Sequence, residues 1–142
     1  MNNVEMAKSY VKQAEERLRH AREAFEEGNY PYVVRQCQEA VELSLKAALR
    51  IAGVESPKWR DVGPVLRRES GRFPEWFQKE IKRLSIASRK LRREREPSMY
   101  GDEESGTPPD ELYYEEDAEE ALSQAGYVHN IVKRLLETYQ TL

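Results

Sequence analysis

The sequence predicts an all-α protein: an up-and-down antiparallel bundle of about five helices, four of them long and one short. Apolar residues recur at steps of three and four along most of the chain, and no segment shows the two-residue alternation of a strand. Glycines and prolines divide the chain at intervals that suit helices. Hydrophobic residues make up 39% of the chain and charged residues 35%, which favours amphipathic helices with ionic outer faces.

The first helix is predicted to end at Gly28 and Asn29, because glycine accepts the left-handed conformation of a C-terminal cap. Its apolar residues lie on one stripe: Val4, Ala7, Val11, Ala14, Leu18, Ala21 and Phe25. The stripe is rich in alanine and covers only about three heptads, so packing within one bundle is favoured, with a helix-to-helix dimer seam as the alternative.

The second helix is predicted at about residues 31–52, where Pro31 suits the first turn because its missing N–H is not needed there. This segment carries apolar residues on more than one face. We therefore expect it to be the central helix, in contact with several neighbours. A connector at 53–60 follows, and Asp61 is the predicted N-cap of a short third helix.

A fourth helix is predicted at about residues 75–95, and Pro97 marks its end. Residues 97–113 contain three prolines and two glycines and are predicted to form a long loop, a feature that is usually functional or mobile. The last helix is predicted to start near Tyr114, where three acidic residues suit its N-terminal dipole.

The 142 residues are interpreted as a single domain at 1–142. Cys37 is the only cysteine, which excludes an internal disulfide, and its apolar neighbours favour a core position. His20 and His129 are interpreted as surface or half-buried residues, and the chain shows no metal-ligand cluster and no cofactor motif. Without a membrane span or a signal peptide, a cytoplasmic protein that does not bind membranes is expected.

Two charge runs stand out although the net charge is only −3. Residues 79–95 contain eight basic residues and two acids, whereas residues 102–120 contain ten acids and no base. The basic run would suit a nucleotide or an RNA backbone. The alternative is that it pairs with the acidic run, in the same chain or in a dimer partner, or is a solvated face.

Arginine can hold phosphate through two parallel hydrogen bonds, so the arginines at the end of the basic run are the candidate phosphate ligands. They are Arg89, Arg92, Arg93 and Arg95. Arg60 is a candidate for a place nearby, and Trp59 and Tyr100 are candidates for stacking on a base.

Several segments together resemble the HEPN domain, whose name stands for higher eukaryotes and prokaryotes nucleotide-binding. The resemblance covers about residues 5–140 and is moderately specific. Its motifs are Gly28-Asn29-Tyr30, Gln38-Glu39-Ala40-Val41-Glu42 with Lys46-Ala47, Asp61-Val62-Gly63, and Tyr100 and Asp102 before the acidic start of the last helix.

The resemblance implies a bundle of about five helices, a homodimer, and often a minimal nucleotidyltransferase as partner in a toxin–antitoxin-type system. Ribonuclease members of the family carry an Arg followed four to six residues later by a His. The matching stretch here, Arg92 to Tyr100, contains no histidine, and Tyr100 stands where that His would be expected after Arg95. A tyrosine with the usual pKa near 10 is a poor proton shuttle at pH 7. The family's His before Asp61 is also absent.

The leading hypothesis is a HEPN-like module that binds a nucleotide, an RNA or a partner protein and is non-catalytic or weakly catalytic. Its site would comprise Arg89, Arg92, Arg93, Arg95 and Tyr100, at the end of the fourth helix and the following loop. One alternative is a metal-independent RNase that uses Arg95 and Tyr100 in a dimer cleft. The other is a pure protein-interaction domain, such as an antitoxin or a scaffold.

Overall fold

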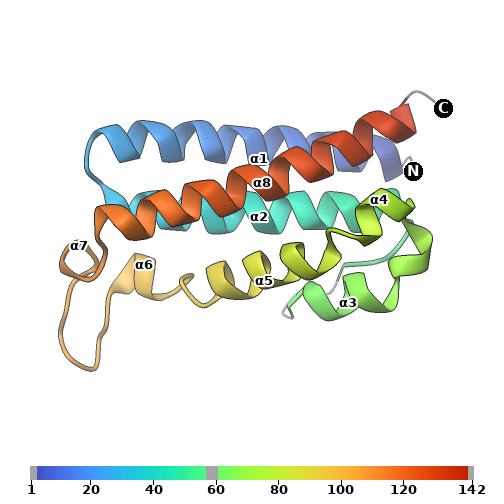
Figure 1. Ribbon diagram of the computed structural model, residues 1–142. Coiled ribbons are helices and arrows are strands. Elements are labelled where there is room, and N and C mark those ends of the chain that lie inside the picture. The colour runs from blue at the N-terminus through green and yellow to red at the C-terminus, as the bar shows by residue number, and fades with distance from the viewer. Residues whose placement is uncertain (1–2, 57–60, 141–142) are drawn as a thin grey trace.

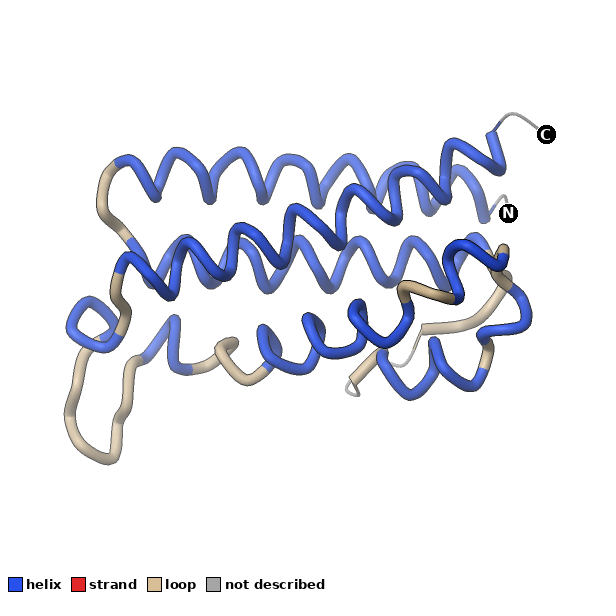
Figure 2. Tube along the Cα trace, in the orientation of Figure 1, coloured by secondary structure: helices blue, strands red, loops and turns tan. Residues whose placement is uncertain are grey.

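Four long helices run alternately in opposite directions in the computed structural model, which describes residues 3–56 and 61–140 (Figure 1). Helices α1 (Asn3–Glu26) and α2 (Tyr30–Ile51) form a hairpin, and α8 (Glu115–Gln140) packs on both of them. Helix α5 (Ile81–Arg92) lies along α2 on the other side of the bundle. The described residues contain no strand, as Figure 2 also shows, so the all-α, up-and-down prediction is confirmed.

Helix α1 buries the stripe that its sequence predicted. Ala7, Ala14 and Ala21 have no exposed surface, and Leu18 is 1% exposed. Because alanine side chains are small, the backbones of α1, α2 and α8 can approach closely along this stripe. The turn after α1 contains Gly28, whose φ of +76° is the left-handed conformation expected at that position.

Helix α2 is the central helix, as its apolar faces predicted, because it contacts α1, α8, α5 and α6. Most of its residues are buried, including Cys37. Burial raises the pKa of the Cys37 thiol to about 12, so the nucleophilic thiolate is not formed near neutral pH. Cys37 therefore serves as a small core residue.

The segment between α2 and α5 is divided into short helices: α3 (Gly63–Arg68), the 3₁₀ turn η1 (Ser70–Arg72) and α4 (Glu75–Gln78). The prediction of one helix at 75–95 is wrong. The helix stops at Gln78, where the Glu80 N–H donates to the Phe77 carbonyl in a tighter turn, and the Tyr127 hydroxyl donates to the Glu80 carboxylate at 2.6 Å. This tertiary contact holds the break between α4 and α5.

Asp61 was predicted to be the N-cap of the short third helix, but it lies one residue before the N-cap of α3. Its side chain still accepts a hydrogen bond from the start of that helix. Val62 occupies the N-cap of α3, and Asp61 Oδ1 accepts from the Gly63 N–H at 3.1 Å. The same oxygen accepts from the Ser88 hydroxyl at 3.2 Å, which ties α3 to α5.

The predicted loop at 97–113 contains two helices of one turn each, α6 (Pro97–Tyr100) and α7 (Pro109–Leu112). Pro97 begins α6 instead of ending the preceding helix, which already stops at Arg92, because proline is suited to the first turn of a helix. Between α6 and α7 the chain makes a tight turn closed by two hydrogen bonds between Asp102 and Thr107, of 2.8 and 2.9 Å.

His129 is more buried than its sequence position suggested. It is 6% exposed, on the side of α8 that packs against α1, whereas His20 is half-buried. Within the described residues, no helix is long and apolar enough to cross a membrane.

Candidate functional site

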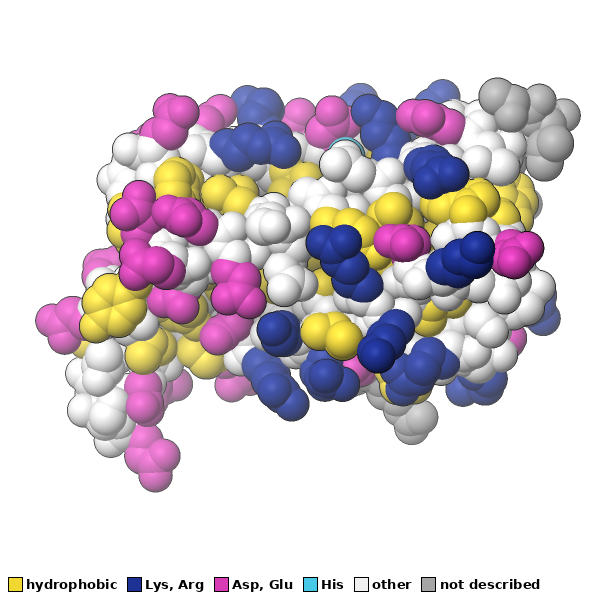
Figure 3. All heavy atoms as spheres, viewed as in Figure 1, with side chains coloured by type: hydrophobic (Ala, Val, Ile, Leu, Met, Phe, Trp, Pro, Cys, Tyr) yellow, Lys and Arg dark blue, Asp and Glu magenta, His cyan; other side chains and the backbone are white. Residues whose placement is uncertain are grey.

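The arginines in the last turn of α5 face solvent because the apolar side chains of the helix occupy its buried face. Leu84, Ala87 and Leu91 are buried, which leaves Arg89 and Arg93 exposed and Arg92 half-exposed. Within the part of the chain that the structure describes, Arg89 and Arg93 form no ion pair. Figure 3 shows basic side chains gathered over α5 and acidic side chains gathered at the end of the bundle near α6 and α7.

Three of the five predicted site residues surround one shallow depression, which we name the arginine hollow. It is lined by Arg92, Arg93, Arg95, Glu96 and Pro97. These residues are brought together because the chain turns sharply after α5, with the Arg95 N–H donating to the Arg92 carbonyl at 3.2 Å. Three arginines that line one depression form a suitable site for a phosphate group.

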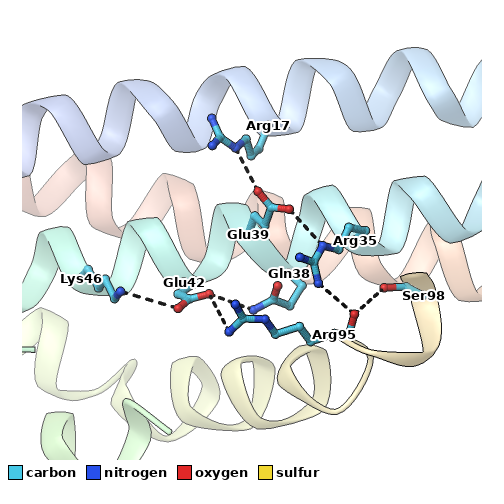
Figure 4. Close-up of polar contacts among 8 residues, drawn as sticks. All are labelled: Arg17, Arg35, Gln38, Glu39, Glu42, Lys46, Arg95 and Ser98. Carbon is cyan, nitrogen blue, oxygen red and sulfur yellow. Dashed lines mark hydrogen bonds and ion pairs between the residues drawn. The ribbon is translucent and has the colours of Figure 1, made fainter. Parts of the chain in front are cut away.

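Arg95 is held by α2 through both its backbone and its side chain (Figure 4). Its carbonyl accepts from Arg35 Nη1 at 2.9 Å and from the Ser98 hydroxyl at 3.3 Å. Its guanidinium lies 4.0 Å from the Glu42 carboxylate. Arg95 therefore combines a structural ion pair with its place at the hollow.

The anchor of Arg95 continues into a polar network across three helices, drawn in Figure 4. Glu42 also accepts from Gln38 at 3.1 Å and lies 3.6 Å from Lys46. Beside it, Glu39 on α2 pairs with Arg35 at 3.1 Å and with Arg17 of α1 at 3.3 Å. The network ties the chain segment that carries the arginines to the centre of the bundle.

Tyr100 does not share the arginine hollow. It is 59% exposed and lines a separate depression, the acidic hollow, whose volume is about 510 Å³. The acidic hollow is lined by Glu94, Glu96, Pro97, Tyr100, Gly101, Asp102, Glu103, Leu112, Tyr113 and Asp117. Five carboxylates without a base repel a phosphate, so this depression is unsuited to the ligand that the arginines favour. Arg89 lines neither hollow, and Trp59 and Arg60 lie outside the described residues.

A third depression, the α5–α8 cavity, adjoins both hollows and has a volume of about 270 Å³. It shares Arg93 with the arginine hollow, and it shares Glu94, Tyr113 and Asp117 with the acidic hollow. The full lining is Val34, Lys90, Leu91, Arg93, Glu94, Tyr113, Asp117, Glu120, Ala121 and Gln124.

Opposite charges meet across the α5–α8 cavity. Lys90 lies 3.7 Å from Glu120, so the two charge runs do pair at this point. The Tyr113 hydroxyl donates to Glu94 at 3.0 Å. Burial, and then the neighbouring Glu94 carboxylate, raise the pKa of Tyr113, which keeps the phenol in its donating, neutral form.

The sequence did not reveal the part that α8 plays in this cavity. Asp117, Glu120 and Gln124 are three or four residues apart, the spacing of one helix face, and that spacing was the available signal. Within the described residues, no group of three or more His, Cys, Asp or Glu is arranged to hold a metal ion.

The fold and the site define a small helical bundle with a basic depression at the end of one helix, and comparison with known proteins identifies the family. The HEPN domain model matches residues 7–135. The chain therefore belongs to the HEPN domain family.

Two solved structures are similar to this chain. TT1696 from Thermus thermophilus is 26% identical, with a TM-score of 0.69 over 94% of this chain and 98% of its own. ST0689, described as an archaeal HEPN homologue, is 25% identical, with a TM-score of 0.67 over 92% of this chain and 97% of its own. No curated protein matches the sequence.

Proposed function

We propose that this HEPN domain is a binding module that takes the phosphate of a nucleotide or of an RNA end into the arginine hollow. The observation that supports it most is the convergence of Arg92, Arg93 and Arg95 on one depression. Arg93 is exposed and forms no ion pair within the described chain, so its guanidinium is available to a ligand. Phosphate bound there would gain charge-assisted hydrogen bonds from more than one arginine.

The module is proposed to be non-catalytic or weakly catalytic. An RNase needs a group that takes and returns a proton near neutral pH, and the stretch Arg92 to Tyr100 contains no histidine. Tyr100 and Arg95 line different hollows within one chain. The RNase alternative places these two residues in a dimer cleft, which a second copy of the chain would complete.

The family membership supports two further parts of the proposal. The module acts as a homodimer, and its protein partner is a minimal nucleotidyltransferase, in a toxin–antitoxin-type system. Sedimentation of the purified protein tests the dimer. Co-purification of a stoichiometric nucleotidyltransferase from the native cell tests the partner, and a nucleotide-free complex would favour a pure interaction domain instead.

The binding test uses a short 5′-phosphorylated RNA and the double variant Arg92→Ala/Arg93→Ala. Removing two charge-assisted contacts is expected to weaken binding by at least about a hundredfold, since each contributes roughly 1.5–3 kcal/mol. The matched control is Arg67→Ala/Arg68→Ala, which removes the same charge from exposed positions at the end of α3.

Equal losses in the two double variants would show that binding follows net charge alone, and the assignment of the arginine hollow would fail. The same RNA, incubated in EDTA with the wild-type protein, tests catalysis. Cleavage that disappears in both Arg95→Ala and Tyr100→Ala would establish the RNase alternative and contradict the non-catalytic proposal.

A further inference from the structure

We propose that the α5–α8 cavity receives the base of the bound nucleotide and selects guanine. This inference rests on the proposed function, because it places the phosphate of the same ligand in the arginine hollow. The observations that carry it are the shared lining residue of the two depressions, the apolar floor of the cavity and the pattern of polar groups at its rim.

Arg93 connects the two depressions. It lines the arginine hollow and also the α5–α8 cavity. A ligand whose phosphate contacts Arg93 therefore has the cavity beside it. The acidic hollow also adjoins the phosphate site, through Glu96 and Pro97, but it contains no arginine and is lined by five carboxylates. Electrostatics thus directs the uncharged part of the ligand to the cavity and keeps its phosphate at the arginines.

The floor of the cavity is apolar. Val34, Leu91 and Ala121 come from α2, α5 and α8 and are 2%, 4% and 4% exposed. Tyr113 adds an aromatic residue that is 7% exposed and fixed by its hydrogen bond to Glu94. Ligand sites in proteins combine such a floor with a few placed polar groups, and nucleobases stack on aromatic side chains. The volume of about 270 Å³ is enough for one base.

The rim of the cavity offers acceptors from α8. Asp117 Oδ2 already accepts from the Tyr114 N–H at 2.8 Å, and Glu120 Oε1 faces Lys90. Among the described residues, the second carboxylate oxygen of each is engaged in no hydrogen bond or ion pair. These oxygens suit a ligand that presents N–H donors.

The rim also offers cationic donors from α5, namely Lys90 and Arg93. Guanine matches this arrangement, because its edge carries the N1–H and amino donors beside the O6 acceptor, and arginine and lysine bind the O6 and N7 acceptors of guanine. Adenine presents an amino group without the ring N–H. Uracil presents a single ring N–H flanked by two carbonyl oxygens, and these oxygens would be repelled by the carboxylates of Asp117 and Glu120.

The test compares four ligands by isothermal titration calorimetry: GMP, AMP, UMP and ribose 5-phosphate, which has the phosphate without a base. GMP is expected to bind at least about tenfold more tightly than UMP and ribose 5-phosphate, as one good base contact gives, with AMP between GMP and those two ligands. Asp117→Asn is expected to remove most of the preference for GMP over UMP while leaving the affinity for ribose 5-phosphate unchanged. Asparagine keeps an oxygen for the Tyr114 N–H, so the start of α8 is preserved.

The matched control is Glu119→Gln, which removes a carboxylate from an exposed neighbouring position that does not line the cavity. It is expected to retain the GMP preference. Equal affinities for GMP and ribose 5-phosphate would overturn the base assignment and leave the phosphate site standing. A preference for UMP would overturn the choice of guanine. Absence of binding by all four ligands would overturn the proposed function itself.

Discussion

The basic run at 79–95 and the acidic run at 102–120 carry opposite charges, and the structure keeps most of their charges on separate surfaces. Lys90 and Glu120 form an ion pair between them. Arg89 and Arg93, by contrast, form no ion pair within the described chain. The basic run therefore keeps arginines that the acidic run does not neutralise. Complementary charge in a sequence does not predict that the charges will pair in the fold.

Specific contacts keep the basic surface and the acidic surface apart. On the basic side, Arg95 is tied to α2 through Arg35 and Glu42, which fixes the end of α5. On the acidic side, the Asp102–Thr107 hydrogen bonds close a turn that leads the acids away from α5. Each surface is thus held by contacts of its own.

The largest expected effect is that of Gly101→Ala, which disrupts the turn closed by Asp102 and Thr107, named here the acidic turn. Gly101 is buried with a φ of +73°, and a Cβ there would overlap the Thr107 carbonyl oxygen. We expect the free energy of unfolding to fall by about 2 kcal/mol or more in urea denaturation. Gly106→Ala is the control, because Gly106 has the same φ with nothing within 4 Å of its Cβ position. Equal losses would contradict the tight packing of the turn at Gly101.

Glu42→Gln tests the structural role of Arg95, its ion pair with α2, separately from its place at the arginine hollow. It removes the carboxylate that faces Arg95 and Lys46 in a half-buried setting, so we expect a loss of about 1 kcal/mol in the free energy of unfolding. Glu69→Gln breaks the more exposed pair with Arg72 and should cost about half as much or less. If the two variants lost the same stability, the anchor of Arg95 to α2 would be no stronger than a surface pair.

A change of pH near neutrality tests the stability of the bundle without titrating a histidine in either charge run, because neither run contains one. Burial lowers the pKa of His129, which lies near Glu15 and Arg22 of α1 and Lys133 of α8. The folded state therefore favours neutral His129, and the unfolded state binds its proton first.

The free energy of unfolding should consequently fall as the pH is lowered through the ordinary histidine pKa of about 6.5. Above that pH the contribution of neutral His129 to stability is fully present. Chemical denaturation at several pH values measures this slope. His129→Gln should reduce the slope. An unchanged slope in His129→Gln would show that another group controls the acid side.

The smallest expected effect is that of Glu104→Lys on phosphate binding. Glu104 is exposed in the acidic turn, so its reversal removes repulsion without a direct contact. We expect the affinity for the phosphorylated RNA to rise by about twofold to threefold at low salt and to return to the wild-type value at high salt. Glu137→Lys makes the same change near the far end of α8 and should have a weaker effect. Equal increases in the two variants would mean that only net charge matters.

Much of the fold could be predicted because apolar spacing directly reflects burial. The stripe of α1, the central place of α2 and the start of α8 follow from which side chains must leave water. The break at Gln78 could not be predicted, because the Tyr127–Glu80 hydrogen bond that holds it joins residues 47 positions apart. The short helices at Pro97 and Pro109 were within reach of the sequence, since proline favours a first helical turn.

The candidate site, too, could be predicted from the sequence only in part. The sequence by itself determined the helical class, the family resemblance and the arginines at the end of α5, because each depends on local spacing and residue type. Only the tertiary structure decided that Tyr100 lines a different hollow from those arginines, and that Asp117 and Glu120 of α8 line a cavity with Lys90 and Arg93. The physical reason is that a site made of several helices depends on how they pack, and long-range contacts leave no periodic signal in the chain.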